Sequence, residues 1–475
     1  MAMKSGGEVV VEAIVAEDIE LVFGNPGDHV LDVYDALRDE QRVRHILVVH
    51  ESTAAFMAEG YGRLTGKPGV CIFTAGPGAT NSVTGVAQAL VSASPMVHIS
   101  GAVPTCSRGE DIHTLFDPRG LARLFEPITK RSTYVERVED IPQALAEAFR
   151  IARSGRPGPV HVEVPLDVLS AGAELPPYSP QRPQPRAVPH ATVQEIARLL
   201  ARARAPLIYA GRDILRYHAS AELRDLVDRT RIPMVEAARE RGMLPDDHPL
   251  YAGFKVGWMT HPAAEYVMEG ADLILVIGVL LGSSYTTFLA KKRATLIDVE
   301  PEENPLAESI GREIAVVGDI KFFLADLLEA CRGYTWPADE ERTARLAALK
   351  REFNQQLEDS YHPEATPIHP GCLTRVLREC LARDAIITRD SGTNNLVTRR
   401  YMPMFTPNSS LGPDWYTGMG CSLPYAMVSK LLFPNRQVVC TVGDAGFLMS
   451  YADFPTVVRE GLNIVVVVEN NRGLG

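Results

Sequence analysis

The sequence predicts an α/β fold made of three consecutive doubly wound parallel-sheet domains. Short apolar runs typical of buried strands alternate with helical patterns along the chain. A chain of 475 residues is also too long for one ordinary hydrophobic core. A proline-rich stretch at 174–189 interrupts the alternation, because proline neither continues a helix nor suits a central strand. We therefore expect domains at 1–173, 190–332 and 350–475.

The expected strands are apolar runs that recur in each domain. In the first domain they lie at 45–50, 69–74, 95–100 and 159–165. In the second they lie at 205–211, 271–278 and 294–300, and an amphipathic helix follows around 320–331. In the third they lie at 385–390, 437–444 and 463–470. Strand, helix and strand in this order are typical of parallel sheets.

Composition and charge exclude several classes of protein. The fractions of hydrophobic and charged residues, 46% and 23%, are those of ordinary globular proteins. A net charge of -11 argues against a nucleic-acid partner, which would require clustered Lys and Arg. The N-terminus lacks the features of a signal peptide, and polar residues interrupt every apolar stretch, so we expect a cytoplasmic protein without a membrane partner. The seven cysteines form no CxxC pair, which favours reduced thiols.

Polar residues follow two of the expected strands of the third domain. Asp444 ends the run QVVCTVGD, and Asn471 follows the run NIVVVVEN, 27 positions after Asp444. Because the carboxyl ends of parallel strands share one edge of a sheet, both side chains can face one ligand. Mg²⁺ prefers oxygen ligands and combines one or two protein ligands with phosphate oxygens. We predict that Asp444, Asn471 and the backbone of Gly473 hold Mg²⁺ bound to a diphosphate.

Small residues surround Asp444 in the sequence. Gly443 precedes it, and Ala445 and Gly446 would let a phosphate approach the backbone N–H groups at the start of a helix. Alone, Asp444 is equally typical of a helix cap, and Asn471 of a strand end. Together they resemble the signature of thiamine diphosphate (ThDP) enzymes, which begins Gly-Asp-Gly and ends Asn-Asn. Here Ala445 replaces the third glycine.

The front of the chain extends this resemblance. The segments 23–37, 48–70, 73–89 and 128–168 resemble the pyrimidine-binding domain of acetohydroxyacid synthase-like ThDP enzymes. In order along the chain, the resemblance covers nearly all of the sequence. It implies a pyrimidine-binding, a middle and a diphosphate-binding domain, and it implies that the last domain is truncated at its C-terminus, since related enzymes continue beyond this point.

The resemblance also implies a role for Glu51. This residue follows the apolar run HILVVH and matches the family glutamate that hydrogen-bonds the aminopyrimidine ring of ThDP. In the family mechanism this carboxyl group exchanges a proton with the ring and so activates the cofactor. A buried, apolar setting would favour the neutral acid. Without the surrounding match, a glutamate in a first helical turn is most simply a partner of the helix dipole.

Two further segments of the third domain resemble cofactor contacts of the family. RDSGTNN at 389–395 is similar to the segment that contacts the diphosphate, which implicates Gly392, Thr393 and Asn394. WYTGMGCSLPYA at 415–426 resembles the stretch in which Met419 would wedge between the two cofactor rings. The backbone near Thr417 would bind the aminopyrimidine. Such residues are otherwise typical of loops and core filling.

Three residues are candidates for acid-base work on the substrate. His29 occupies a position similar to the active-site histidine of benzaldehyde lyase, and Asp28 resembles an aspartate of pyruvate decarboxylase. His113 falls where acetohydroxyacid synthases carry a phenylalanine. Titratable groups in a cleft are fair candidates for proton transfer. Ordinary surface or loop positions remain the alternative for all three.

The resemblance implies a ThDP- and Mg²⁺-dependent decarboxylase or carboligase acting on a 2-keto acid. A carbon–carbon lyase or hydrolase that releases no CO₂ is one alternative, and a non-catalytic cofactor-binding homologue is another. FAD is not expected, because Ala102 replaces the usual Gln and the segment 278–288 lacks the Arg and paired Asp of the flavin-binding enzymes. The resemblance further implies a homodimer or homotetramer with active sites between subunits.

Overall fold

The computed structural model describes residues 2–110, 119–237, 240–256, 259–281 and 286–474. They form two compact units. Unit 1 runs through Pro183 and also contains Ile387–Gly392 and the chain from Leu411 onward. Unit 2 contains Gln184–Ile386 and Thr393–Ser410. Mostly parallel sheets with helices between the strands confirm the expected α/β class.

Unit 1 begins with a six-stranded parallel sheet in the order β3-β2-β4-β5-β7-β6. Its strands are β2 (Leu21–Asn25), β3 (Arg44–Leu47), β4 (Gly69–Phe73), β5 (Met96–Ala102), β6 (Arg131–Tyr134) and β7 (Pro159–Pro165). A short antiparallel pair, β1 (Ala2–Ser5) and β8 (Gly172–Leu175), lies outside this sheet. After β2 the chain adds β3 on one side of it, and it then crosses over to add β4 on the other side. The strand order therefore reverses between β2 and β4, where ligands bind in open α/β sheets.

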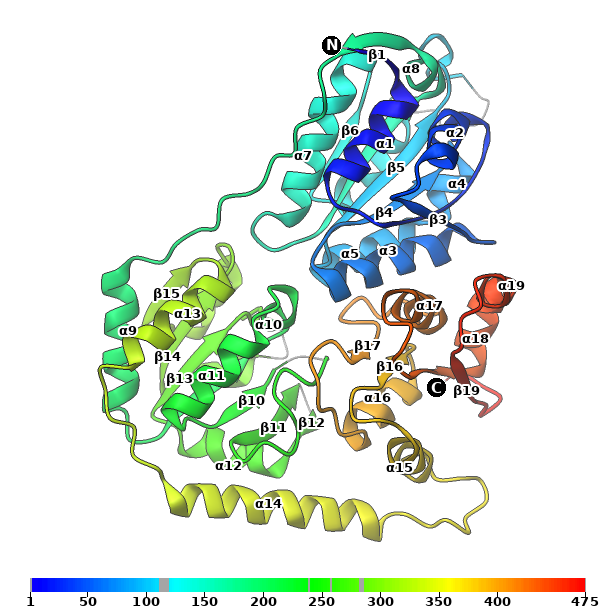
Figure 1. The fold of residues 1–475 in the computed structure, drawn as a ribbon. Coiled ribbons are helices and arrows are strands. Elements are labelled where there is room, and N and C mark those ends of the chain that lie inside the picture. Colours follow the sequence, from blue (N-terminus) through cyan, green and yellow to red (C-terminus); the bar gives the residue numbers. More distant parts are fainter. Residues whose placement is uncertain (1, 111–118, 238–239, 257–258, 282–285, 475) are drawn as a thin grey trace. The chain divides into compact units, whose positions relative to one another are not determined.

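Helices cover both faces of this sheet (Figure 1). One group contains α1 (Gly6–Ala16), α2 (Leu31–Asp39), α7 (Ile141–Arg153) and α8 (Leu166–Ser170). The other contains α3 (Glu51–Thr65) and α5 (Val83–Val91), and the short α4 (Pro77–Thr80) and α6 (Gly120–Phe125) complete the domain. Single turns of 3-10 helix lie at Asp28–Val30, Thr105–Ser107, Glu126–Ile128 and Val138–Asp140. Every residue of β5 and β7 is buried, as expected for strands covered on both faces.

Unit 2 contains a seven-stranded sheet in the order β12-β11-β10-β9-β13-β14-β15. The strands are β9 (Pro206–Ala210), β10 (Met234–Glu236), β11 (Tyr251–Val256), β12 (Met259–Thr260), β13 (Leu273–Ile277), β14 (Thr295–Glu300) and β15 (Ile314–Val317). All neighbouring pairs are parallel except β11 with β12. The helices are α9 (His190–Arg202), α10 (Asp213–Arg216), α11 (Ser220–Thr230), α12 (Pro262–Gly270), α13 (Ile320–Cys331), α14 (Glu340–Asp359), α15 (Pro370–Cys380) and α16 (Thr393–Tyr401). Two 3-10 segments lie at Thr287–Lys291 and Pro305–Ile310.

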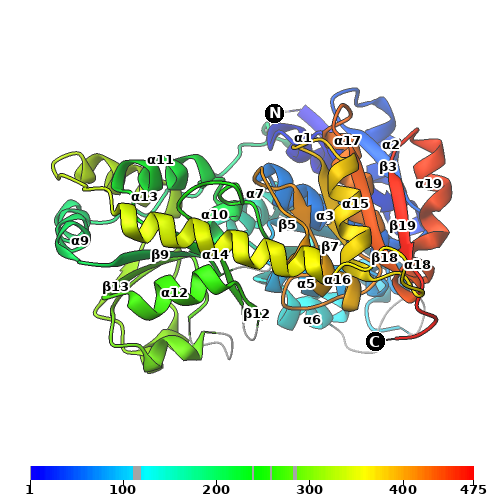
Figure 2. The same cartoon turned by 90° about the horizontal axis from the view of Figure 1, so that it is seen from below.

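Two separate cores show why this sheet is doubly wound. Along β9, Ile208 and Ala210 belong to a core with α9, α11 and α13, whereas Leu207 and Tyr209 belong to a core with α12 and α14. This alternation follows from the two-residue period of side chains along a strand. Figure 2 shows α11 and α13 on one side of the sheet and α12 on the other.

The last sheet has the order β17-β16-β18-β19. Its strands are β16 (Ile386–Arg389), β17 (Ser410–Leu411), β18 (Val438–Gly443) and β19 (Val465–Glu469). The helices around it are α17 (Ser422–Leu432), α18 (Asp444–Ser450) and α19 (Phe454–Arg459), with a 3-10 turn at Tyr451–Asp453. β18 and β19 are parallel, as the sequence predicts.

Two predicted boundaries differ from the structure. β3 ends at Leu47 rather than at 50. The Val48 N–H still bonds to Gly24 in β2, but those of Val49 and His50 donate to the carboxylate of Asp453 (2.6 and 3.2 Å). The proline-rich stretch begins inside β8 and then runs without helix or strand to α9. No helix among the described residues is long and apolar enough to cross a membrane.

Candidate active site

The point where the strand order reverses in unit 1 holds His29. This residue lies in the turn after β2, and its Nδ1 shares a hydrogen bond of 3.1 Å with Thr74 Oγ1 at the end of β4. Gly101 lets β5 approach, because a Cβ there would lie 2.4 Å from the His29 carbonyl oxygen. The imidazole is therefore half-buried and fixed in orientation at the carboxyl edge of the sheet.

Glu51 lies at the same edge, as the first residue of α3. Asn81 Nδ2 donates to its Oε2 at 3.0 Å, and a Cβ on Gly78 would be 3.7 Å from its Oε1. The side chain is half-buried rather than fully buried. Asp453, from the turn after α18, binds the backbone just before Glu51 through Val49 and fixes the start of the helix.

Asp28 and His113 are the other two acid-base candidates. Asp28 precedes His29 in the same turn, and its side chain is exposed to solvent. His113 lies outside the residues that the structure describes.

The predicted diphosphate and metal residues gather at one edge of the last sheet. Gly443, the last residue of β18, pairs in register with Glu469, the last residue of β19. Asp444 begins α18, and its Oδ1 accepts the N–H of Ala445 at 2.7 Å. Asn471 Oδ1 accepts the N–H of Gly473 at 3.1 Å. The parallel pairing thus brings the Asp444 and Asn471 segments to the same edge.

Open space adjoins two glycines at this edge. A Cβ built on Gly443 or Gly473 would meet no atom within 4 Å. Gly446 is different, because a Cβ there would lie 2.9 Å from the carboxyl carbon of Asp390. Gly446 therefore accommodates a buried carboxyl group of the chain itself.

The oxygen donors at this edge suit Mg²⁺. One carboxylate, one amide oxygen and one backbone carbonyl leave coordination positions for phosphate oxygens, as hard cations prefer. No group of three or more His, Cys, Asp and Glu that could hold a metal occurs among the described residues. Asp444, Asn471 and Gly473 stay predicted metal ligands.

Sequence reasoning missed Asp390, which organises the segment around Met419. Burial raises the pKa of this carboxyl group to about 6, against the lowering effect of backbone N–H donors. Those donors include Gly420 at 3.0 Å and Ser422 at 3.1 Å. Met419 itself is half-buried, and Thr417 is exposed with a positive φ of 57°. The sequence could have indicated Asp390, because it directly follows a buried strand.

The residues predicted to contact the diphosphate from the 389–395 segment divide between the units. Gly392, with φ of 116°, belongs to unit 1. Thr393 and Asn394 open α16 in unit 2, and the side chain of Asn394 is buried.

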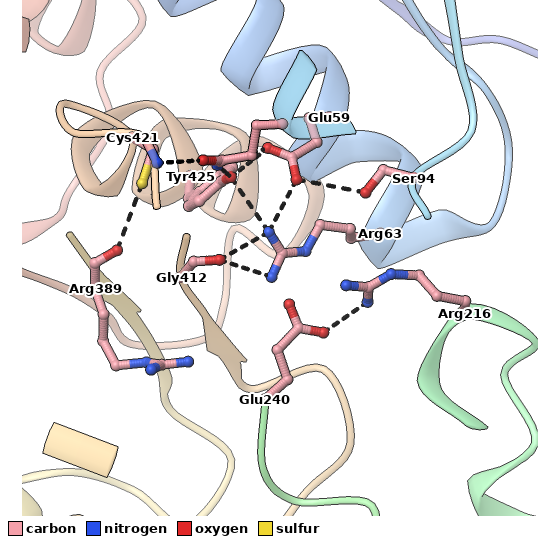
Figure 3. Close-up of polar contacts among 11 residues, drawn as sticks. Glu59, Arg63, Ser94, Arg216, Glu240, Arg389, Gly412, Cys421 and Tyr425 are labelled. Carbon is pink, nitrogen blue, oxygen red and sulfur yellow. Dashed lines mark hydrogen bonds and ion pairs between the residues drawn. The ribbon is translucent and has the colours of Figure 1, made fainter. Parts of the chain in front are cut away.

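A buried polar cluster joins α3 to α17, and it was not predicted from the sequence (Figure 3). Arg63 NH1 donates to Glu59 Oε1 at 3.1 Å, and both Arg63 NH groups donate to the Gly412 carbonyl at 3.0 Å. The Tyr425 hydroxyl donates to Glu59 Oε2, and Gln88 Nε2 donates to the same oxygen at 3.2 Å. Glu and Arg spaced i,i+4 among small and apolar residues of one helix were the available signal.

Three family models match the chain. The N-terminal TPP binding domain of thiamine pyrophosphate enzymes matches residues 4–120. The central domain matches residues 193–327, and the C-terminal TPP binding domain matches residues 390–475. Together the matches cover more than half of the chain and follow its three-part organisation.

Curated relatives are similar over the whole chain. A probable acetolactate synthase large subunit of Methanocaldococcus jannaschii is 34% identical over 99% of this chain and 80% of its own length. The large subunit of acetolactate synthase isozyme 3 of Escherichia coli is 33% identical over 100% of this chain and 83% of its own length. An acetolactate synthase of Mycobacterium bovis is 33% identical over 99% of this chain and 76% of its own length.

Proposed function

The chain belongs to the thiamine pyrophosphate-dependent enzymes, and we propose that it is a Mg²⁺-dependent carboligase of the acetolactate synthase type. In this reaction one 2-keto acid loses CO₂, and the remaining acyl carbon is joined to a second carbonyl compound. The observation that carries the proposal is the 34% identity to an acetolactate synthase large subunit over 99% of the chain.

The residues present fit two parts of the cofactor at one end of the last sheet. Asp444, Asn471 and the backbone of Gly473 would hold Mg²⁺ and the diphosphate, with open space beside Gly443. The segment with Thr417 and Met419 would hold the aminopyrimidine ring. When bound, ThDP supplies a carbon nucleophile and accepts the electron pair that departing CO₂ leaves behind.

Glu51 would hold and move the proton that activates the cofactor ring. Asn81 binds Oε2 and so orients the carboxyl group. Oε1 lies near the backbone of Gly78, 3.7 Å from where a Cβ on that residue would stand. The half-buried position keeps water partly away from the shared proton and strengthens its hydrogen bond.

His29 is the proposed proton-transfer residue for the substrate carbonyl. Thr74 binds its Nδ1 and so fixes the ring at the carboxyl edge of the sheet, where the imidazole would serve as the acid or base. Asp28 precedes it in the exposed part of the same turn, and its proposed role is to orient substrate. The role of His113 stays a prediction from the sequence.

The test is product analysis with pyruvate, ThDP and Mg²⁺. The proposal expects CO₂ release together with a ligation product, and Glu51→Gln should lower kcat by about 100-fold or more, as loss of a proton-transfer group does. Carbon–carbon cleavage of a hydroxy ketone without CO₂ would support the lyase instead. Binding of ThDP with no turnover of either substrate class would support a non-catalytic homologue.

Two features of the assembled enzyme complete the proposal. We expect a homodimer or homotetramer with active sites between subunits, which sedimentation analysis would measure. We also expect no need for FAD, so the purified protein should lack flavin absorbance and added FAD should not change its rate. A flavin that copurifies in stoichiometric amount would contradict this expectation.

A further inference from the structure

Two buried acceptors hold the backbone on either side of Met419. Gln88 Oε1, from α5, accepts the N–H of Gly418 at 2.9 Å, and Asp390 Oδ1 accepts the N–H of Gly420 at 3.0 Å. Thr417 has a φ of 57°, a left-handed conformation that costs a non-glycine residue about 1–2 kcal/mol. The segment 417–420 therefore needs contacts from outside itself to keep its shape.

The orientation of the Gln88 amide is fixed by its partners. Nε2 donates to Glu59 Oε2, and a carboxylate can only accept hydrogen bonds. Oε1 must therefore face Gly418. Arg63 binds the other oxygen of Glu59 and keeps the carboxylate in place. Because Gln88, Glu59 and Arg63 are all buried, water does not compete for these bonds.

Gly418 permits an unusually direct contact. A Cβ at this position would lie 2.6 Å from Gln88 Oε1, so only glycine lets the amide reach the backbone without a shift. The contact joins a helix of the first sheet domain to the segment that precedes α17.

We propose that Gln88 is a positioning residue for the aminopyrimidine half of the cofactor site. The inference rests on the proposed function, because it requires the segment 417–420 to bind that ring. The diphosphate half is built by Asp444 and Asn471 at the ends of β18 and β19, and the Gln88 amide bonds to Glu59 and Gly418 rather than to either of them. Loss of the Gln88 bond should therefore affect the ring and leave the diphosphate unaffected.

Binding of ThDP and of inorganic pyrophosphate distinguishes the aminopyrimidine half of the cofactor site from the diphosphate half. Gln88→Met keeps the side-chain volume and removes the acceptor. We expect its Kd for ThDP with Mg²⁺ to rise about tenfold, the range of one buried hydrogen bond, and its Kd for inorganic pyrophosphate with Mg²⁺ to stay within about twofold. Ser94→Ala is the matched control, because it removes a hydroxyl that donates to Glu59 Oε1 in the same cluster and does not bind Gln88, whereas the Tyr425 hydroxyl does. It should lower the Tm and change neither Kd by more than about twofold.

Hydrogen exchange gives a readout that needs no cofactor. In Gln88→Met, a peptide containing Gly418 should exchange about tenfold faster, whereas a peptide covering 438–443 should be unchanged. Gln88→Glu should restore protection at low pH, because a protonated Glu beside Glu59 is isosteric with Gln, and should lose it as pH rises. This variant also serves if Gln88→Met does not fold.

Three results would decide against the inference. These are equal weakening of both probes by Gln88→Met, no weakening of either, or unchanged exchange at Gly418. Failure of the wild-type protein to bind ThDP would instead overturn the proposed function, and the exchange measurement would still decide whether Gln88 holds the segment.

Discussion

Two buried clusters, one in each unit, use the same kinds of side chain to different ends. The unit 1 cluster contains Glu59, Arg63, Tyr425 and Gln88, and the unit 2 cluster contains Glu236, Arg241, Tyr251 and Asp246. In both, a buried arginine binds a carboxylate and backbone carbonyls, and a tyrosine hydroxyl donates to a glutamate. Chemistry alone therefore does not distinguish them.

The difference lies in what each cluster holds. Glu236 accepts the N–H groups of Gly242 and Met243, both at 2.9 Å, and so closes the loop that follows β10. The unit 1 cluster instead reaches the candidate site through Gln88 and Gly418. We therefore assign the unit 1 cluster to the candidate site, because its member Gln88 binds the backbone there.

The largest expected effect comes from removing the central arginine of either cluster. Arg63→Met and Arg241→Met should each lower the stability of the unit that contains them by about 3–5 kcal/mol, because a buried carboxylate loses its partner. Urea unfolding followed by circular dichroism measures this. The exposed Arg38, paired with Asp39, gives the control, and Arg38→Met should leave the free energy of unfolding unchanged within error, because solvent screens this pair. Equal values for the buried and exposed sites would contradict the comparison.

The next effect is a dependence of stability on pH that comes from Glu236 in the unit 2 cluster. Burial raises the pKa of Glu236 to about 7, well above its ordinary value. A raised folded-state pKa means that the folded protein binds this proton more tightly, so the stability it contributes is present at low pH and is lost as pH rises from about 4.5 to 7. Glu236→Gln, which does not titrate, should become more stable relative to wild type over that range by about 1–3 kcal/mol. A difference independent of pH would show that the carboxyl group does not titrate there.

An effect of opposite sign is expected in the first sheet. Burial lowers the pKa of His98 to about 3, and Ser82 Oγ lies 2.7 Å from its Nε2. The unfolded chain then binds this proton more tightly, so stability is present above about pH 6.5 and is lost as pH falls toward 3. Wild type should lose about 1 kcal/mol per pH unit relative to His98→Gln below pH 6. Parallel pH profiles would contradict a neutral buried imidazole.

The sequence predicted what local patterns encode. The run 159–165 coincides with β7, because both faces of that strand are buried and its residues are continuously apolar or paired. The positions of Asp444 and Asn471 followed from the geometry of parallel strands. The end of β3 was predicted three residues too late, because a carboxylate some 400 residues away, Asp453, binds the N–H groups of the last two residues of the predicted run.

Long-range contacts also explain what the sequence did not reveal at the site. Nothing near Gln88 in the sequence indicates that its amide meets Gly418, since the two are brought together by packing of α3 against both α5 and α17. Asp390 has the same character, because its partners lie about 30 residues further along the chain. Contacts of this kind depend on tertiary packing and carry no local periodicity.

The most direct test of the central claim is calorimetric titration with ThDP, with and without Mg²⁺, for wild type and Asp444→Ala. The account predicts Mg²⁺-dependent binding that weakens more than about tenfold in the variant, because the metal loses its one side-chain carboxylate. Wild-type protein that binds no ThDP in the presence of Mg²⁺, or a variant that binds as tightly as wild type, would contradict it.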